Sequence, residues 1–357
     1  MHVNRFLVIA SLALPAVWML AGCSSKDHRT AKNPSKHSDE RVAAVKNLTD
    51  QIELVDLAKT SDDWRVRQAA IKKLTDQDVL IAIAKNEKEL QHVRIKAIEK
   101  LTKLSVLVEI AQNDKNSWVR VWTAEKLKGR HPAVAQAVLA DVARHDEDWM
   151  ARNTAVEHLT DPAALADVAR QDENHYVRRA AVWKLTDQAV LAEVAQHDDH
   201  LRVRWYAAVK LDESHQAVAY VVFLDVAKHD EDGAVRAEAM NRLPATDQAV
   251  FADIAKHDDD PYVRLMAVRR LTDQDVLADV AKNDDTYYVR RDAAHRLTDQ
   301  ATLADVAKND ERPEVRKQAI HRLTDLTVLA DLAKNDKDSS VRLQAEKKLD
   351  RLRGQQE

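Results

Sequence analysis

Apolar and polar residues follow one another along most of the chain in a pattern that repeats every twenty-six residues. The clearest copy reads LTDQDVLADVAKNDDTYYVR, and its successor, LTDQATLADVAKNDERPEVR, starts at Leu297. In the first copy, Leu277, Val280 and Ala281 have the i, i+3, i+4 spacing of a helix that buries one face. A second apolar set with helical spacing follows the NDD segment and ends at Leu297. Each repeat therefore predicts a first helix, a short turn and a second helix.

Twelve repeats align on two columns without exception: a leucine that closes the repeat and an arginine seven residues before it. The leucines are Leu48, Leu74, Leu101, Leu127, Leu159, Leu185, Leu211, Leu243, Leu271, Leu297, Leu323 and Leu349. The arginines are Arg41, Arg67, Arg94, Arg120, Arg152, Arg178, Arg204, Arg236, Arg264, Arg290, Arg316 and Arg342. A short helical pair cannot bury its apolar face alone, so such self-similarity is typical of a solenoid. The sequence predicts an all-α fold of stacked helical hairpins.

A column of aspartates lies six residues before the arginines. Its members are Asp114, Asp146, Asp172, Asp198, Asp230, Asp258, Asp284, Asp310 and Asp336. In the earlier repeats Glu87 is displaced by one position and Ser61 lacks the charge. An arginine near a helix N-terminus is opposed by the helix dipole and needs a compensating partner. We expect the Asp and Arg columns to be structural, because a catalytic pair would not recur in every repeat.

The pattern Asp-x4-Val-Arg-x2-Ala-x3-Leu resembles HEAT repeats, in particular short bacterial HEAT-like units that include the phycobilin-lyase type. The period is also similar to that of leucine-rich repeat variants. The resemblance covers residues 39–357 and implies an α-α superhelix of the HEAT/armadillo kind, with the Asp and Arg columns forming a ladder between neighbouring repeats. It also raises a lyase hypothesis. Against that hypothesis, Cys23 is the only thiol and aromatic residues make up only 4% of the chain, so we expect no enzyme and no cofactor.

Charge is spread evenly through the repeats. The chain has 55 basic and 59 acidic residues, for a net charge of -4, and both signs occur in every repeat. Nucleic-acid binding needs a concentrated basic face. We therefore expect no nucleic-acid partner.

The first residues have the features of an export signal. Arg5 precedes an apolar run that is too short for a comfortable membrane span, and the run ends in small residues before Cys23. The sequence LAGC resembles the lipobox of bacterial lipoproteins, which implies cleavage before Cys23 and lipidation of its sulfur. Ser24 and Ser25 resemble the signal that forwards such proteins to the outer membrane, facing the periplasm. We expect a signal peptide over 1–22, a lipidated flexible tether over 23–38 and the solenoid over 39–357.

Two repeats are six residues longer than the others. The steps from Leu127 to Leu159 and from Leu211 to Leu243 are thirty-two residues each, and both insertions are expected to lengthen the first helix. Pro132 fits the first turn of one, and Ser214 is expected to cap the other. The second insertion places apolar residues together at 220–223, which predicts either a docking patch or an extended buried helix.

Aromatic residues gather in the turn before the arginine column. They are Trp64, Trp118, Trp149, Tyr176, Tyr262, Tyr287 and Tyr288. They could anchor an extended peptide or a partner protein, or each ring could pack on the start of the second helix or on the next repeat.

Histidines alternate with asparagines just before the aspartate column: His145, His197, His229 and His257. Successive repeats stand roughly 10 Å apart, so these side chains cannot share one metal ion. We expect them to act at helix C-termini and predict no metal site, with the segment His197-Asp198-Asp199-His200 the best local candidate for one.

The sequence as a whole predicts a non-catalytic scaffold, anchored by lipid to the membrane, that binds another protein or peptide. A structural envelope spacer without a specific ligand and an accessory subunit of an enzyme are the alternatives.

The lipidation prediction is tested by Cys23→Ser. Because acyl chains on this sulfur would hold the protein on a bilayer, the variant should leave the membrane fraction or accumulate as an unprocessed precursor. Fractionation with mass measurement of the mature N-terminus checks this. Unchanged membrane association and processing would contradict it.

Overall fold

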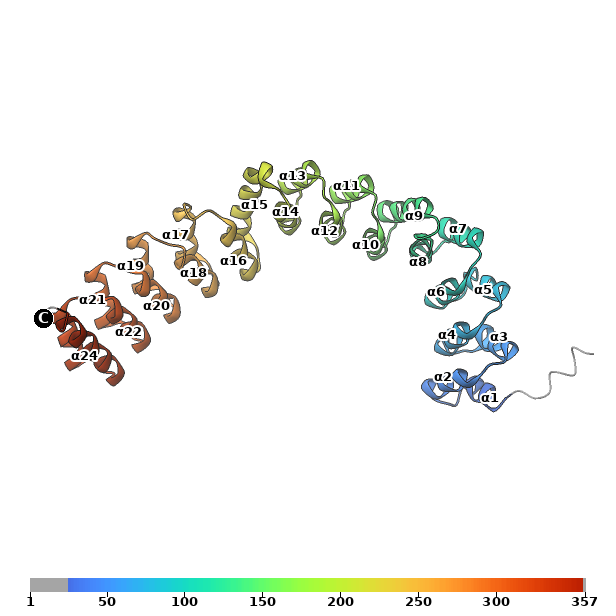
Figure 1. Cartoon of the computed structure of the whole chain (residues 1–357), viewed down its shortest axis with the longest axis horizontal. Coiled ribbons are helices and arrows are strands. Elements are labelled where there is room, and N and C mark those ends of the chain that lie inside the picture. Colours follow the sequence, from blue (N-terminus) through green and yellow to red (C-terminus); the bar gives the residue numbers. More distant parts are fainter. Residues whose placement is uncertain (1–24, 356–357) are drawn as a thin grey trace, which may run out of the picture. The chain divides into compact units, whose positions relative to one another are not determined.

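The computed structural model describes residues 25–355, and all regular elements among these residues are helices. Cys23 and the expected signal peptide lie outside the described residues. Helices alternate along the chain between two layers and pair as hairpins (Figure 1). The first helices are α1 (Lys26–Lys32), α3 (Gln51–Thr60), α5 (Gln77–Ala84), α7 (Leu104–Asn113), α9 (Pro132–His145), α11 (Pro162–Gln171), α13 (Gln188–His197), α15 (Gln216–His229), α17 (Gln248–His257), α19 (Gln274–Asn283), α21 (Gln300–Asn309) and α23 (Leu326–Asn335).

The second helices complete the hairpins. They are α2 (Ser38–Asn47), α4 (Trp64–Lys73), α6 (Gln91–Lys100), α8 (Ser117–Leu127), α10 (Trp149–His158), α12 (His175–Lys184), α14 (Leu201–Val209), α16 (Gly233–Arg242), α18 (Pro261–Val268), α20 (Tyr287–Arg296), α22 (Pro313–Arg322) and α24 (Ser339–Arg353). A 3-10 turn, Glu213–His215, precedes α15. The described residues thus form 24 α-helices in about twelve hairpins, which confirms the predicted all-α solenoid.

Contacts divide the chain into two compact units, Met1–Ala181 and Val182–Glu357. In each unit the second helices pack on one another more closely than the first helices do. The residue three after each arginine explains this difference, since it is alanine in eleven repeats and Ala97, Ala155 and Ala293 are fully buried. A side chain that small lets neighbouring helix backbones approach closely.

Most first helices begin where the sequence predicts, at the LTD segment. In α19, Asp273 is the N-cap, and its Oδ1 accepts hydrogen bonds from the N–H groups of Asp275 (3.0 Å) and Val276 (3.2 Å). An aspartate cap satisfies N–H groups that have no partner inside the helix. The closing leucines form the core of the stack. They are buried in every repeat except at Leu211, which is half-buried and lies just before the second insertion.

Most column arginines link two successive turns. Arg264 donates from Nε and Nη2 to the two carboxylate oxygens of Asp284, in the next repeat, at 2.7 and 3.1 Å. Its Nη1 donates to the backbone oxygen of Asp258, six residues earlier, at 2.9 Å. The aspartate six residues before an arginine therefore offers that arginine its carbonyl, and gives its carboxylate to the arginine of the preceding repeat.

This arrangement recurs through both units. Two bonds to one carboxylate join Arg94–Asp114, Arg152–Asp172, Arg236–Asp258, Arg264–Asp284, Arg290–Asp310 and Arg316–Asp336. Where the aspartate column fails, a neighbour replaces it: Arg41 binds Asp62 at 2.5 Å and Arg67 binds Glu89 at 2.8 Å. Arg178 donates to the backbone oxygen of Asp172 at 2.8 Å.

The ladder carboxylates are nearly removed from solvent. The side chain of Asp336 is 4% exposed and that of Arg316 is 1% exposed. Burial alone would raise the pKa of Asp336, but hydrogen bonds from Arg316 and from the N–H of Asp338 hold it below its ordinary value. The arginine responds in the opposite direction: the hydrogen bond that Arg264 donates to Asp284 raises the pKa of Arg264.

A second ladder, which sequence analysis did not predict, is built by glutamines that begin several of the first helices. Gln274 Oε1 accepts from the N–H (2.8 Å) and the hydroxyl (2.9 Å) of Thr298 in the next repeat. The Oε1 atom accepts from a backbone N–H of the next repeat in the same way at Gln51, Gln77, Gln188, Gln248 and Gln300, and also at Gln136, which lies within α9. The recurrence of the glutamine was visible in the sequence, and its bond satisfies the backbone that connects one repeat to the next.

The described part of the expected tether is ordered, which corrects that prediction. Residues 26–32 form α1, the first helix of the first hairpin, although KDHRTAK has no apolar stripe. Polar bonds hold it instead: His28 Nε2 and Lys32 Nζ lie 2.8 and 2.7 Å from Asp56, and Arg41 Nε donates to the backbone oxygen of Ala31 at 2.9 Å. Prediction from the spacing of apolar residues alone misses a helix of this kind.

Both insertions lengthen the first helix, as predicted. Helices α9 and α15 have 14 residues each, and Pro132 occupies the first turn of α9. The expected Ser214 cap is wrong. The cap of the preceding 3-10 turn is Asp212, which accepts from the N–H of Ser214 at 3.1 Å. The N-cap of α15 is His215, whose side chain makes no capping bond to the helix N–H groups.

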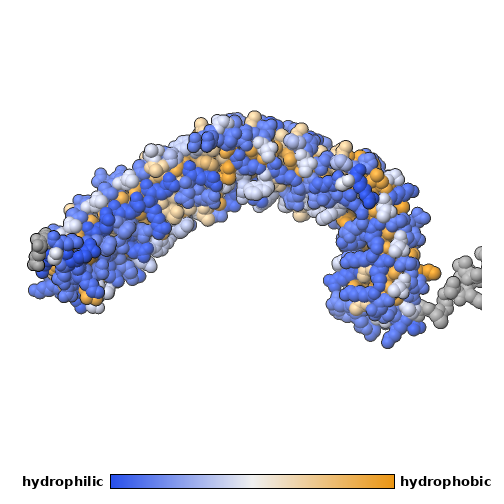
Figure 2. All heavy atoms as spheres, in the orientation of Figure 1, coloured by the Kyte–Doolittle hydropathy of each residue, from blue (hydrophilic) through white to orange (hydrophobic). Residues whose placement is uncertain are grey.

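The surface seen in the space-filling view is mostly hydrophilic, and apolar residues show in seams between helices (Figure 2). Among the described residues, none of the helices combines the length and the apolar character that a bilayer span requires.

The ladder makes a stability prediction at Arg316. Arg316→Met leaves the buried carboxylate of Asp336 without its guanidinium, and breaking such a pair costs about 3 kcal/mol of unfolding free energy. Urea denaturation of the full chain, followed by circular dichroism, measures the loss.

The matched control is Arg342→Met, at the last position of the column. The bond recorded for this side chain is Nη1 to the backbone oxygen of Asp336, at 2.7 Å. Its loss should cost only about 1 kcal/mol. Equal destabilisation by the two variants would show that the carboxylate pairing does not stabilise the fold.

Candidate functional site

The aromatic residues of the turn stand where a second helix begins. In α10 the carboxylate of Asp146 accepts from the N–H of Asp148 at 3.1 Å, and Asp148 in turn caps the helix by accepting from Met150 N–H at 2.9 Å. These two consecutive bonds fix the turn and place Trp149 at the first helical residue. The cap pattern therefore sets the position of the ring at the edge of the stack.

Five of the seven turn aromatics keep more than a third of their surface exposed. The values are 39% for Trp64, 39% for Trp149, 44% for Tyr176, 52% for Tyr262 and 37% for Tyr287. Trp118 and Tyr288 are half-buried.

The rings also pack on neighbouring repeats, which is one of the two alternatives that the sequence left open. Trp149 stacks on Tyr176 of the next repeat with centroids 5.7 Å apart, and Trp64 meets His92 edge-on at 4.6 Å. Packed rings that stay exposed form rigid apolar surface, because the neighbouring repeat limits their rotation.

Arginines lie over several of these rings. The guanidinium carbon is 5.5 Å from the ring centre for Arg65 on Trp64, 5.2 Å for Arg179 on Tyr176 and 4.7 Å for Arg312 on Tyr287. Cation–π contacts of this kind are weak where water has access to them. They add positive charge beside the aromatic surface.

Two further exposed tryptophans were missed by the sequence analysis. Trp122 on α8 is 43% exposed, and Trp183 on α12 is 67% exposed. Trp183 meets Tyr206 edge-on with centroids 6.4 Å apart. The signal that could have found Trp122 is its spacing, since it follows Trp118 by four residues and so lies on the same helix face.

The residues of the apolar run in the second insertion, 220–223, differ in their exposure to solvent. Val221 is 64% exposed, Val222 is 4% exposed, and Tyr220 and Phe223 are half-buried. Phe223 packs edge-on against Trp205 of α14 at 5.3 Å. The run lies on a first helix, whereas the turn aromatics begin the second helices, so the two features do not form one surface.

A cavity of about 770 Å³ lies between α13 and α15 within the second unit. Its lining combines Val218 and Val221 with Arg204 and Asp225. The ladder changes at this point: Arg204 donates to Asp225 on α15 at 2.7 Å, and Asp230 accepts instead from Arg202 at 3.2 Å. In the first insertion Arg120 still reaches the turn aspartate, Asp146, at 3.3 Å.

The column histidines bind carboxylates on their own helices. The Nδ1 atom of His145, His229 and His257 lies 3.1, 2.8 and 3.1 Å from the aspartate four residues earlier. In the 198–200 segment, Asp198 accepts from His200 N–H at 2.8 Å. Within residues 25–355, no three His, Cys, Asp or Glu side chains gather in a way that could hold a metal ion.

Comparison with known proteins identifies no family for this chain. No family model matches the sequence, and no curated protein matches it. Among solved structures, importin beta is 14% identical with a TM-score of 0.37 over 91% of this chain, and the match spans 59% of importin beta. An engineered protein is 16% identical with a TM-score of 0.24, over 92% of this chain and 93% of that one. A designed armadillo repeat protein in complex with peptide (KR)4 is 18% identical with a TM-score of 0.11, over 84% of this chain and 98% of that one.

The altered ladder makes a pH prediction at Asp225. Burial alone would raise the pKa of Asp225, but hydrogen bonds from His229 and Arg204 hold it below the ordinary 3.8. A carboxyl with a depressed folded-state pKa stabilises the protein above the unfolded-state value of about 3.9 and loses that contribution as pH falls through the folded-state pKa.

Carbon NMR of labelled aspartate should therefore show a midpoint below 3.8 for Asp225. Arg204→Met should move the midpoint upward, because it removes one of the two donors. A wild-type midpoint at or above the ordinary value would contradict the pairing.

Proposed function

We propose that the protein is a non-catalytic scaffold that binds another protein or a peptide, and that a lipid on Cys23 holds it in the envelope of a bacterial cell. The observation that carries the binding proposal is the exposure of the turn aromatics, with Trp149 and Tyr176 stacked across two repeats and both more than a third exposed. Aromatic side chains dominate the energetics of protein interfaces.

The fold supports this function by geometry. Stacked hairpins present long helical surfaces, and repeats of this kind are used as extended binding surfaces. A partner that lies along the turn edge would meet one aromatic position after another within a unit. The rings are already packed on their neighbours, so binding would cost little loss of side-chain freedom.

The experiment is crosslinking in intact envelopes, followed by purification of the full chain and mass spectrometry. Trp149→Ala with Tyr176→Ala should reduce the recovery of specific crosslinked partners by more than about ten-fold, because hot-spot aromatics contribute about 2 kcal/mol or more each. Ile52→Ala is the matched control, since Ile52 is 74% exposed on α3, a first helix of the same unit.

The melting temperature of each variant is measured as a control, because loss of the stacking between Trp149 and Tyr176 itself lowers the stability by roughly 1 kcal/mol. Unchanged crosslinks in a folded double variant would favour the alternative function, a structural spacer without a specific ligand.

A further inference from the structure

A groove of about 400 Å³ separates α2 and α4, two neighbouring second helices of the first unit. Val42, Val45 and Ala69 lie along it, and Val45 is fully buried beneath the surface. The groove therefore has an apolar floor recessed between two helices, which suits an aliphatic side chain.

One end of the groove is aromatic and nearly neutral. Trp64 lines it with a ring that is 39% exposed. Arg65 lies against this ring and also pairs with Asp39 at 3.6 Å. The charge of Arg65 is thus balanced at this end by the one carboxylate that lines the groove.

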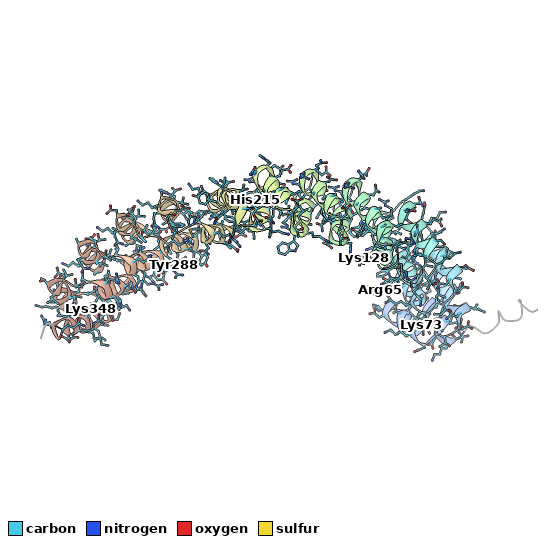
Figure 3. All side chains as sticks on the ribbon, turned by 45° about the horizontal axis from the view of Figure 1, so that its top comes forward. Arg65, Lys73, Lys128, His215, Tyr288 and Lys348 are labelled. Carbon is cyan, nitrogen blue, oxygen red and sulfur yellow. The ribbon has the colours of Figure 1, made fainter. Side chains whose placement is uncertain are left out.

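The other end is cationic. Lys46, Lys72 and Lys73 line it, at the C-termini of the two helices, and Figure 3 labels Arg65 and Lys73 near the opposite ends of α4. Lys73 Nζ donates to the backbone oxygen of Lys46 at 2.5 Å. Within the described part of the chain, none of the three ammonium groups has a carboxylate within 4.0 Å, although carboxylates outnumber basic groups in the whole sequence.

We propose that this groove binds an acidic peptide segment of a partner protein, with an aliphatic side chain on the valine floor and neighbouring carboxylates at the lysine end. The proposal rests on the peptide-binding function above and adds the chemistry of the ligand. Ammonium groups that have no carboxylate partner, beside an apolar groove, favour an anionic partner.

A peptide is favoured over a membrane surface by shape. The apolar floor lies between two helices in a groove of about 400 Å³, which a side chain can enter. Lipid headgroups in a bilayer instead meet a basic protein surface through charge, within about a Debye length. Binding of the membrane would leave the valine floor unused.

The test uses the full chain in detergent micelles and fluorescence anisotropy of a labelled peptide with one leucine beside three glutamates. The wild-type chain should bind this probe, and Lys46→Glu with Lys72→Glu should weaken binding about ten-fold or more. Higher salt should weaken it further, because the charges are exposed to screening. A probe with lysines in place of the glutamates should not bind.

Two other variants separate shape from charge. Ala69→Leu fills the floor without changing charge and should also abolish binding. Lys59→Glu, at an exposed position on α3 of the neighbouring layer, is the matched control for charge reversal and should bind as the wild type does. Circular dichroism verifies that every variant is folded.

Several outcomes would overturn the groove proposal: no binding of the acidic probe, equal binding of the lysine probe, or binding that survives both the charge reversal and Ala69→Leu. Loss of binding to phosphatidylglycerol vesicles in the charge variant, without loss in Ala69→Leu, would assign the lysines to a membrane instead. The scaffold proposal fails separately, through the crosslinks of the Trp149 and Tyr176 variants.

Discussion

The stack depends on one side chain used in two directions. A column arginine such as Arg264 holds the carboxylate of the following repeat with two nitrogens and the carbonyl of its own turn with the third. Because the guanidinium and the carboxylate are both buried, neither can be left without the other at low cost. The turn carrying Asp284 is in this way held in place by the repeat before it, and the same turn supplies the carbonyl for Arg290. Position and orientation of successive hairpins follow from this shared contact.

Much of the fold could be predicted because the same pattern of apolar and polar residues recurs in each repeat. The leucine, alanine and arginine columns fixed the helices, the buried faces and the need for an acidic partner. The direction of pairing could not be derived, since an aspartate offers both a carbonyl and a carboxylate and only coordinates show which arginine takes which. Helix α1 was missed for a related reason. Its contacts with Asp56 and Arg41 are polar, and the spacing of hydrophobic residues does not indicate such contacts.

The candidate site was predictable to the extent that it belongs to a column. The turn aromatics share one position, so their exposure at the start of the second helices follows from the helix caps. The cavity beside α15 was not predictable, because the two insertions have equal length and similar sequence. Leu139 and Ala140 are buried in α9, whereas Phe223 and Leu224 are only half-buried in α15. The cavity accompanies these larger side chains and the changed partner of Arg204. The number of inserted residues alone does not predict it.

The bonds that join repeats connect residues close in sequence: 20 positions separate Arg290 from Asp310, and 24 separate Gln274 from Thr298. Native contacts in such a molecule are short-range along the polypeptide, which keeps the entropic cost of forming them low. A hairpin can therefore reach its final structure once its successor exists, without waiting for distant parts of the chain. Gain or loss of a whole repeat would leave the remaining junctions chemically unchanged, so proteins of this design can change in length by duplication while keeping the same rules of assembly.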